Sequence, residues 1–499
     1  MKRILILFLA VLFFVLAFAG CSSKKKQTKN DDNGNSGEAG ENNAEEVETS
    51  LPAKNWGGRE LKVIELNSEL ESAVFASEDD ITNSVSAVVY SRNEAIKAKY
   101  NFSISTVRAS GEQTKRPSDI IEKESNSGEC SYDLVIDSVS YMKGALSHFM
   151  FCDLTALPYI DWNASCWDEK ANNELSILGH RFVCTGDLNL LEKSGASVIY
   201  CNRNILDTVI PEDEDFRQEV LDGEWTMERM VQLMRAANRV DADETVEIYG
   251  LLNQGHGVFV NFMQATCGMK FTENDDQGIP HFTFDDAEYF EQTLKWIDDV
   301  LAFYSKKNLT YTQRYSGTRP NSKALFKDGR GLFFAGELGD VIDLQKTATF
   351  TYTTLPYPIY DPEIQTEYTT ALDYSFSGLM AIPYYAADPE FSAFALQAMN
   401  ERSGDLMHLF VEDKCKIKGS VDATDYKLMT LALSNGSYDL GAVYNWGALK
   451  TWIFQDYRPD DNKSIPVGGE NNFATLWAQD KDLAHEELRE FMERFQQAS

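Results

Sequence analysis

The sequence predicts an α/β fold, and two observations carry that prediction. Five short runs are apolar at nearly every position, which is typical of strands buried on both faces of a parallel sheet. Amphipathic segments that begin with helix-start signals lie between and after these runs. Strands that alternate with helices in this way indicate an α/β architecture. The five expected strands cover residues 61–66, 132–136, 197–200, 331–334 and 378–382.

Three helix starts follow from local signals. Thr226 precedes an apolar stripe and can cap a helix, and Trp225 just before it can form a hydrophobic staple. Asp285 is expected to cap a second helix. Asp388 is followed by Pro389, the usual order of a helix cap and the first helical position. Apolar residues follow each of these caps at helical spacing, so each predicted helix has a face to bury.

Length and charge exclude several classes of function. The chain has 499 residues, which at about 150 residues per domain allows two to four domains or lobes. Hydrophobic residues make up 43% of it, too many for a disordered chain. Its 46 basic and 78 acidic residues give a net charge of −32, which excludes bulk nucleic-acid binding. The same charge is repelled by an anionic membrane surface, so membrane attachment requires a lipid or an apolar segment.

The N-terminus has the pattern of a secretory signal. A positively charged start is followed by the apolar tract 4–19, small residues and Cys21. This ending resembles a bacterial lipobox, although Phe18 stands where an aliphatic residue is usual. The resemblance implies that residues 1–20 are a signal peptide and that Cys21 is lipidated. The alternative is an uncleaved membrane anchor, for which the tract is short. Residues 21–56 are expected to be the lipidated cysteine and a flexible tether, because polar residues dominate up to residue 50.

The cysteines and the short motifs give no sign of a metal or cofactor. The chain has eight cysteines, and without Cys21 an odd number remains, so at least one thiol stays free. We expect mostly buried free thiols, with a Cys152–Cys166 disulfide as the alternative. The sequence contains no zinc-type cysteine spacing, H-E-x-x-H, G-x-S-x-G or P-loop pattern. We therefore expect neither a metal site nor a cofactor.

A series of motifs, each weak alone, resembles one family when taken in order. The chain is similar over nearly the whole folded body to the family 1 extracellular solute-binding proteins of ABC importers, the maltose-binding-protein-like group. The motifs that carry the resemblance are YDLVIDSVSYMKGALSHFMFCDLTAL (132–157), SVIYCNRNILD (197–207), EWTMERMVQLMRAAN (224–238), ALFKDGRGLFFAGELGDVIDL (324–344) and YDLGAVYNWG (438–447).

The resemblance implies two α/β lobes joined by a hinge with chain crossovers. The first lobe is expected to hold 57–195 and 350–400, and the second 196–349 and 401–499. The implied function is that of a lipid-anchored, monomeric binding protein on the extracytoplasmic face of a membrane, in a Gram-positive type of cell. It captures a solute, most commonly a carbohydrate or oligosaccharide, and delivers it to the transmembrane subunits of an ABC permease. It needs no catalysis.

Candidate ligand-binding residues follow from the chemistry of a saccharide. In open α/β sheets, ligands bind outside the carboxyl ends of strands. A neutral saccharide needs hydrogen-bonding side chains for its hydroxyls and flat aromatic rings for its apolar faces. The candidates are Asn67, Ser68, Asp137, Ser138, Tyr141, Asn253, Glu337, Tyr374 and Trp446.

Each candidate also has a structural explanation, and the sequence leaves both open. Asn67 and Ser68 can simply turn the chain. Asp137 and Glu337 can cap helices, and Trp446 can pack in the core. Two other functions remain as alternatives: a surface glycoside hydrolase, whose carboxylate pair could lie among the many acids, or a sensor accessory protein that presents a ligand.

Overall fold

The computed structural model describes residues 49–68, 70, 72–109, 116–254, 258–313, 321–415, 422–449 and 471–498. These residues form a mixed α/β structure, so the predicted fold class is confirmed. The predicted signal peptide and Cys21 lie outside the described residues. The predicted tether boundary at residue 56 needs correction, because Leu51 and Trp56 are buried. The Lys54 ammonium also donates to the Tyr159 hydroxyl at 3.0 Å, and the compact body begins at Thr49.

One of the two main sheets has four strands in the order β13-β3-β1-β2. Its central strand β1 buries Leu61, Val63 and Ile64, as the apolar run predicts. Strands β1, β2 and β3 run parallel, and β13 runs antiparallel to β3. The strands are β1 (Arg59–Leu66), β2 (Phe102–Ala109), β3 (Leu134–Ser138) and β13 (Gly378–Ala381).

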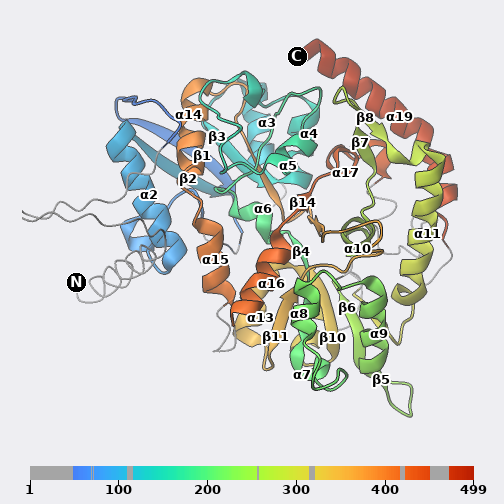
Figure 1. Cartoon of the computed structure of the whole chain (residues 1–499). Coiled ribbons are helices and arrows are strands. Elements are labelled where there is room, and N and C mark those ends of the chain that lie inside the picture. The colour runs from blue at the N-terminus through green and yellow to red at the C-terminus, as the bar shows by residue number, and fades with distance from the viewer. Residues whose placement is uncertain are drawn as a thin grey trace, which may run out of the picture. The chain divides into compact units, whose positions relative to one another are not determined.

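The other main sheet has six strands in the order β11-β4-β10-β6-β5, with β9 paired to β6. Strands β6, β9 and β10 run parallel, whereas β4 is antiparallel to β10. In Figure 1 these strands and those of the four-stranded sheet form two separate groups, each with its own helices. The strands are β4 (Ser197–Asn202), β5 (Arg239–Val240), β6 (Val246–Asn253), β9 (Thr310–Thr312), β10 (Gly331–Glu337) and β11 (Tyr352–Leu355).

All five predicted strands form, but two directions were wrong. The runs 197–200 and 378–382 become β4 and β13, which are antiparallel to their neighbours β10 and β3. Both strands are fully buried, so their composition matches that of a parallel strand. An apolar run reports burial and carries no signal for direction.

The helix caps were predicted well because they depend on neighbouring residues. The Thr226 hydroxyl accepts from the Arg229 amide at 3.2 Å, and Asp388 caps α14 ahead of Pro389. The third cap is displaced by one position. Asp286 rather than Asp285 accepts from the amide of Tyr289, at 2.8 Å.

The helices surround the two sheets. Those associated with the four-stranded sheet are α2 (Ser84–Tyr100), α3 (Pro117–Ser127), α4 (Val139–Ser147) and α14 (Pro389–Asn400). Those associated with the six-stranded sheet are α7 (Arg203–Leu206), α8 (Phe216–Leu221), α9 (Met227–Ala237), α12 (Ser322–Lys327) and α16 (Ala423–Leu433). The others are α5 (Glu169–Glu174), α6 (Leu190–Ser194), α10 (Val258–Cys267), α11 (Ala287–Tyr304), α13 (Val341–Thr347), α15 (Leu406–Cys415), α17 (Leu440–Tyr444) and α19 (Phe473–Ala498).

The chain crosses between the two sheets more than once, as expected, but one boundary moves. The predicted first lobe includes 350–400, yet β11 in that range pairs with β4 of the six-stranded sheet. Only at β13 does the chain pair with β3 of the four-stranded sheet. The crossover therefore lies between Leu355 and Gly378.

The C-terminal helix α19 contacts parts of the chain that are far apart in sequence. Near its start, the Trp477 ring lies 5.6 Å from Phe282 of β8 (Pro280–Phe282), and Figure 1 shows α19 in red beside β7 (Thr272–Asn274), β8 and α11. Near its end, Phe491 lies 5.6 Å from Phe149, which follows α4. The predicted second lobe includes 401–499, but this end of α19 packs beside a helix of the four-stranded sheet.

Candidate functional site

Four polar side chains meet at one edge of the six-stranded sheet. Strands β6 and β10 are parallel, with Asn253 opposite Ala335, so their carboxyl ends lie side by side. The Gln254 amide that follows β6 donates to the Glu337 carboxylate at 3.0 Å and also to Asp340. The Lys323 ammonium donates to Asp340 at 2.8 Å. We refer to Gln254, Lys323, Glu337 and Asp340 as the edge cluster.

Burial controls the charge of the edge cluster. Glu337 is 7% exposed and Asp340 is 9% exposed. Burial, together with the negative charge of Asp340, holds the pKa of Glu337 well above its usual range. Burial also raises the pKa of Asp340, although the Lys323 ammonium opposes that rise. Both shifts disfavour the state in which the two carboxyl groups are charged at the same time.

A glycine makes room for the cluster. At Gly336, a Cβ atom would lie 2.5 Å from a carboxylate oxygen of Asp340 and 3.1 Å from the side-chain nitrogen of Gln254. Any larger residue would therefore push these two side chains away from β10.

A segment between β12 (Thr370–Ala371) and β13 passes close to the edge cluster. The Asp373 amide donates to the Gly195 carbonyl at 2.8 Å, and the Leu338 amide donates to the neighbouring Ala196 carbonyl at 2.8 Å. Leu338 directly follows Glu337. The negative charge of Asp373 accordingly contributes to the raised pKa of Glu337, after burial and Asp340.

The same segment exposes one large aromatic side chain. Phe376 is 52% exposed, whereas Tyr374 and Ser377 beside it are buried. The Ser377 carbonyl accepts from the Val139 amide at 3.0 Å, where α4 begins. Phe376 therefore lies at the carboxyl end of β3.

Asn67 and Ser68 lie just beyond the carboxyl end of β1. The Asn67 amide donates to the Ala109 carbonyl at 2.7 Å, and the Ser68 hydroxyl accepts from the Leu70 amide at 3.3 Å. These bonds turn the chain, as one reading of the sequence expects. Asn67 is nevertheless exposed, so its amide group is accessible to a ligand.

Asp137 and Ser138 end β3 and are fully buried. The Asp137 carboxylate accepts from the amide and hydroxyl of Ser118, at 2.9 and 2.7 Å, and so caps α3 rather than the next helix. Burial raises the pKa of Asp137 to about 6. The Ser138 hydroxyl has no hydrogen-bond partner within the part of the chain that the structure describes.

Tyr141 and Asn253 differ in their access to solvent. Tyr141 is half-buried, with the Arg116 guanidinium 3.4 Å from the centre of its ring. Asn253 is fully buried, and its side-chain oxygen accepts from the Tyr304 hydroxyl at 3.3 Å. Its side-chain nitrogen has no hydrogen-bond partner among the described residues.

Tyr374 and Trp446 both pack inside the protein. The Tyr374 hydroxyl accepts from the Asp439 amide at 2.9 Å. Trp446 is 4% exposed, and its ring stacks on Tyr444 with centroids 5.1 Å apart and planes within 8°. The centre of its ring also lies 5.4 Å from that of Phe491 of α19. A role for either side chain in ligand binding stays a prediction.

Of the nine candidates, only Glu337 belongs to the edge cluster. Glu337 joins Gln254 and Asp340 in the edge cluster, whereas Trp446 lies against α19. Sequence reasoning missed Lys323 and Phe376. For Phe376 there was a signal, since a large aromatic residue between two serines and ahead of a strand is hard to explain by core packing.

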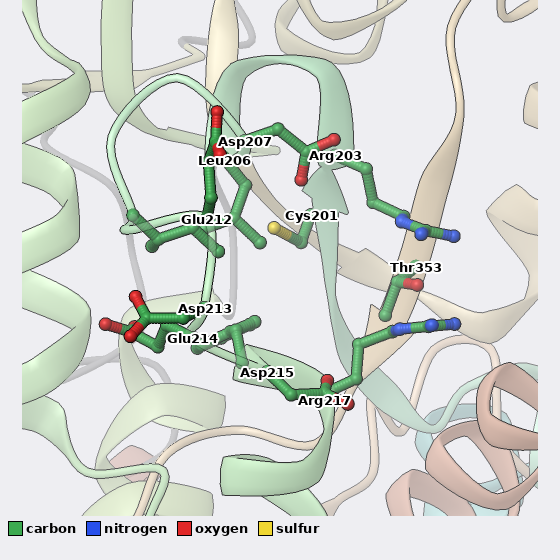
Figure 2. A pocket seen from close by; sticks show the side chains of 12 residues that line it. Cys201, Arg203, Leu206, Asp207, Glu212, Asp213, Glu214, Asp215, Arg217 and Thr353 are labelled. Atoms are coloured by element: carbon green, nitrogen blue, oxygen red, sulfur yellow. The ribbon is translucent and has the colours of Figure 1, made fainter.

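A separate pocket of about 310 Å³ lies at the opposite edge of the six-stranded sheet. Cys201 is one of its lining residues, and Cys201 pairs with Phe333 near the amino end of β10. Figure 2 shows Arg203 and Arg217 side by side on one wall. Both guanidiniums lie near the buried Asp425 carboxylate, at 3.7 and 3.5 Å, so the protein itself balances their charge.

Three further observations concern the cysteines, possible metal ligands and membrane-spanning helices. Six cysteines are free among those described, including Cys152 and Cys166, so the alternative disulfide is not present. Within the described ranges, no group of three His, Cys, Asp or Glu side chains is arranged to hold a metal ion. None of the helices that the structure describes is both long and apolar enough to span a membrane.

Comparison with solved structures identifies the fold. The galacto-N-biose-/lacto-N-biose I-binding protein of the ABC transporter from Bifidobacterium longum, solved with lacto-N-biose, matches with a TM-score of 0.56 at 12% identity, over 88% of this chain and 99% of that one. UspC of M. tuberculosis matches with a TM-score of 0.52 at 12% identity, over 86% of this chain and 100% of that one. No family model matches the sequence, and no curated protein matches it. The chain therefore has the fold of an ABC-transporter solute-binding protein, as the motif resemblance implied.

Proposed function

We propose that the protein is the substrate-binding component of an ABC importer, anchored by a lipid on Cys21 to the extracytoplasmic face of the membrane. It captures a carbohydrate and delivers it to the transmembrane subunits of the importer, as a monomer and without catalysis. The fold is the observation that carries this proposal, because the chain shares it along 88% of its length with a protein named for binding a disaccharide.

The ligand contacts the edge cluster on one side and the carboxyl ends of β1 and β3 on the other. Saccharide hydroxyls both donate and accept hydrogen bonds. The edge cluster offers donors from Gln254 and Lys323 and acceptors from its two carboxylates. On the side of the four-stranded sheet, Asn67 after β1 is exposed and Tyr141 of α4 is half-buried, so each offers a polar group to the ligand. The two lobes close on the ligand by hinge motion.

A saccharide screen tests the binding function. The melting temperature of the purified protein is measured with lacto-N-biose, maltotriose, mannotriose or cellotriose. Each saccharide that raises it is then titrated by calorimetry. A ligand at 100 times its Kd stabilises the folded state by about 2.7 kcal/mol, so the melting temperature rises. Glu337→Gln should weaken binding, whereas Glu228→Gln, on the exposed face of α9, should not. A lack of binding by every saccharide, or hydrolysis of the bound one, contradicts the proposal.

The anchor is tested separately. Intact mass of the membrane fraction should show a diacylated or triacylated Cys21 at the start of the mature chain. Cys21→Ala should release the protein from the membrane, because the proposal gives the chain no other attachment. Unchanged membrane association of that variant would contradict the lipid anchor but leave saccharide binding standing.

A further inference from the structure

Phe376 is a large apolar side chain that the fold holds in solvent. It is 52% exposed, so the protein forgoes the stabilisation that burial of a Phe side chain would give. Single exposed apolar residues are common and need no special cause. The surroundings of Phe376 set it apart, because it belongs to the segment that joins the two main sheets.

The backbone around Phe376 is fixed by hydrogen bonds. The Asp373 carbonyl accepts from the amides of Phe376 and Ser377, at 2.9 and 2.7 Å. The Phe376 carbonyl accepts from the Ser194 hydroxyl at 3.0 Å, and the Ser377 hydroxyl donates to the Glu192 carbonyl at 2.9 Å. The loop is therefore anchored on both sides of Phe376, and the ring is held outward.

The loop that carries Phe376 lies next to both parts of the proposed site, the region of Tyr141 and the edge cluster. On one side, the Tyr374 carbonyl accepts from the Ser140 amide at 2.9 Å, one residue before Tyr141. On the other side, the Asp373 amide donates to the Gly195 carbonyl and the Leu338 amide donates to the neighbouring Ala196 carbonyl, each at 2.8 Å, so Asp373 lies close to Glu337. An exposed aromatic face thus lies between hydrogen-bonding groups, the combination that a pyranose ring requires, since one face is apolar and its edge carries hydroxyls.

We propose that Phe376 is the stacking platform for a sugar ring, and that the ligand is therefore a saccharide that presents an apolar pyranose face to it. This inference rests on the proposed function. It assigns to Phe376 the aromatic contact with the ligand that the sequence predicted for Trp446. Phe376 selects the ring shape of the ligand, while the edge cluster binds its hydroxyls.

Three substitutions at one position test the stacking. Each variant is titrated by calorimetry with whichever of lacto-N-biose, maltotriose, mannotriose and cellotriose the wild type binds most tightly. Phe376→Ala should weaken that binding roughly tenfold, in the range of an interface anchor. Phe376→Tyr keeps the aromatic face and should bind within about twofold of wild type. Phe376→Leu keeps apolar volume without a flat face and should bind like the Ala variant.

Tyr384→Ala is the matched control, because Tyr384 is also 52% exposed but contacts Tyr385 and Ser125 instead. It should leave affinity unchanged, and none of the variants should lose more than a few degrees of melting temperature. Wild-type affinity in Phe376→Ala overturns the stacking role and leaves the proposed function intact. Equal affinity of the Leu and Tyr variants overturns the aromatic part of the inference. Failure of the wild type to bind all four saccharides overturns both.

Discussion

Replacement of Trp446 by Ala separates two roles for one side chain. The sequence predicts a ligand contact, and the structure gives Trp446 a packed environment between Tyr444 and Phe491, with 4% of its surface exposed. The packing of Trp446 also depends on the close approach of its own segment to α19. At Gly447, a Cβ atom would lie 2.5 Å from the Cβ atom of Ala484 on α19. We expect Trp446→Ala to loosen this contact between η5 (Trp446–Ala448) and α19.

The size of the effect follows from burial. Truncating a buried Trp to Ala costs about 3–5 kcal/mol. Unfolding entropy is about 2.1 cal/mol/K per residue near 60 °C, so the compact body Thr49–Ser499, with roughly 450 residues, gives about 0.9 kcal/mol/K. The melting temperature should then fall by about 3–5 °C if the body unfolds as one unit. Trp446→Phe keeps an aromatic ring in the same place, so its melting temperature should fall by less than that of Trp446→Ala.

Calorimetric melting of the ligand-free proteins measures this loss, and titration with the tightest-binding saccharide measures affinity. We expect an early-melting Trp446→Ala variant that still binds within about twofold of wild type. A variant with unchanged melting temperature and strongly reduced affinity would refute the packing argument. It would show that Trp446 contacts the ligand, as the sequence pattern predicts.

Three other results are expected. Gly336→Ala should displace Asp340 and lower both saccharide affinity and stability, the latter by about 1–3 kcal/mol; an unchanged titration curve would show that the close approach is unimportant. Asp137 and Asp439 have pKa values of about 6, above the ordinary 3.8, so their destabilising effect is absent below about pH 4 and complete above pH 6. The urea midpoint should therefore rise from pH 7.5 to pH 5, and a fall would contradict this. The edge cluster offers two carboxyl groups against one ammonium and so has no surplus of positive charge. Glucuronic-acid-containing disaccharides should therefore bind more weakly than neutral ones of equal size when both are titrated by calorimetry, and equal or tighter binding would contradict this.

Local signals account for what the sequence predicted well. The caps at Thr226 and Asp388 form because a cap needs only its own side chain and an amide a few residues later. A buried strand such as β10 is visible because nearly all of its residues are apolar and buried. Strand direction depends on where the chain returns from, which is why β4 and β13 were assigned wrongly.

The candidate site was harder to predict because its members come from distant parts of the chain. Asn253 and Glu337 were predicted from their positions after strands, but it is Gln254, the residue after Asn253, that the pairing of β6 with β10 brings to Glu337. Lys323 reaches Asp340 only through the packing of α12 on β10, for which the sequence has no local sign. Asp137 was predicted as a ligand contact because it follows β3. The same position also allows the cap that it forms on α3, and the sequence alone does not separate the two roles.

The contrast between Phe376 and Trp446 shows why residue type alone cannot locate a binding surface. Both side chains offer a flat apolar face, and both are next to glycine or serine in the sequence. They differ in whether other side chains cover that face. Tyr444 and Phe491 already cover the Trp446 ring, so a sugar would have to displace aromatic contacts worth about 0.5–1.5 kcal/mol each. Phe376 is 52% exposed on a hydrogen-bonded loop, so a sugar would displace only water. The side chain whose apolar face is still in water gains the most from stacking, and for that reason affinity should respond to position 376 and stability to position 446.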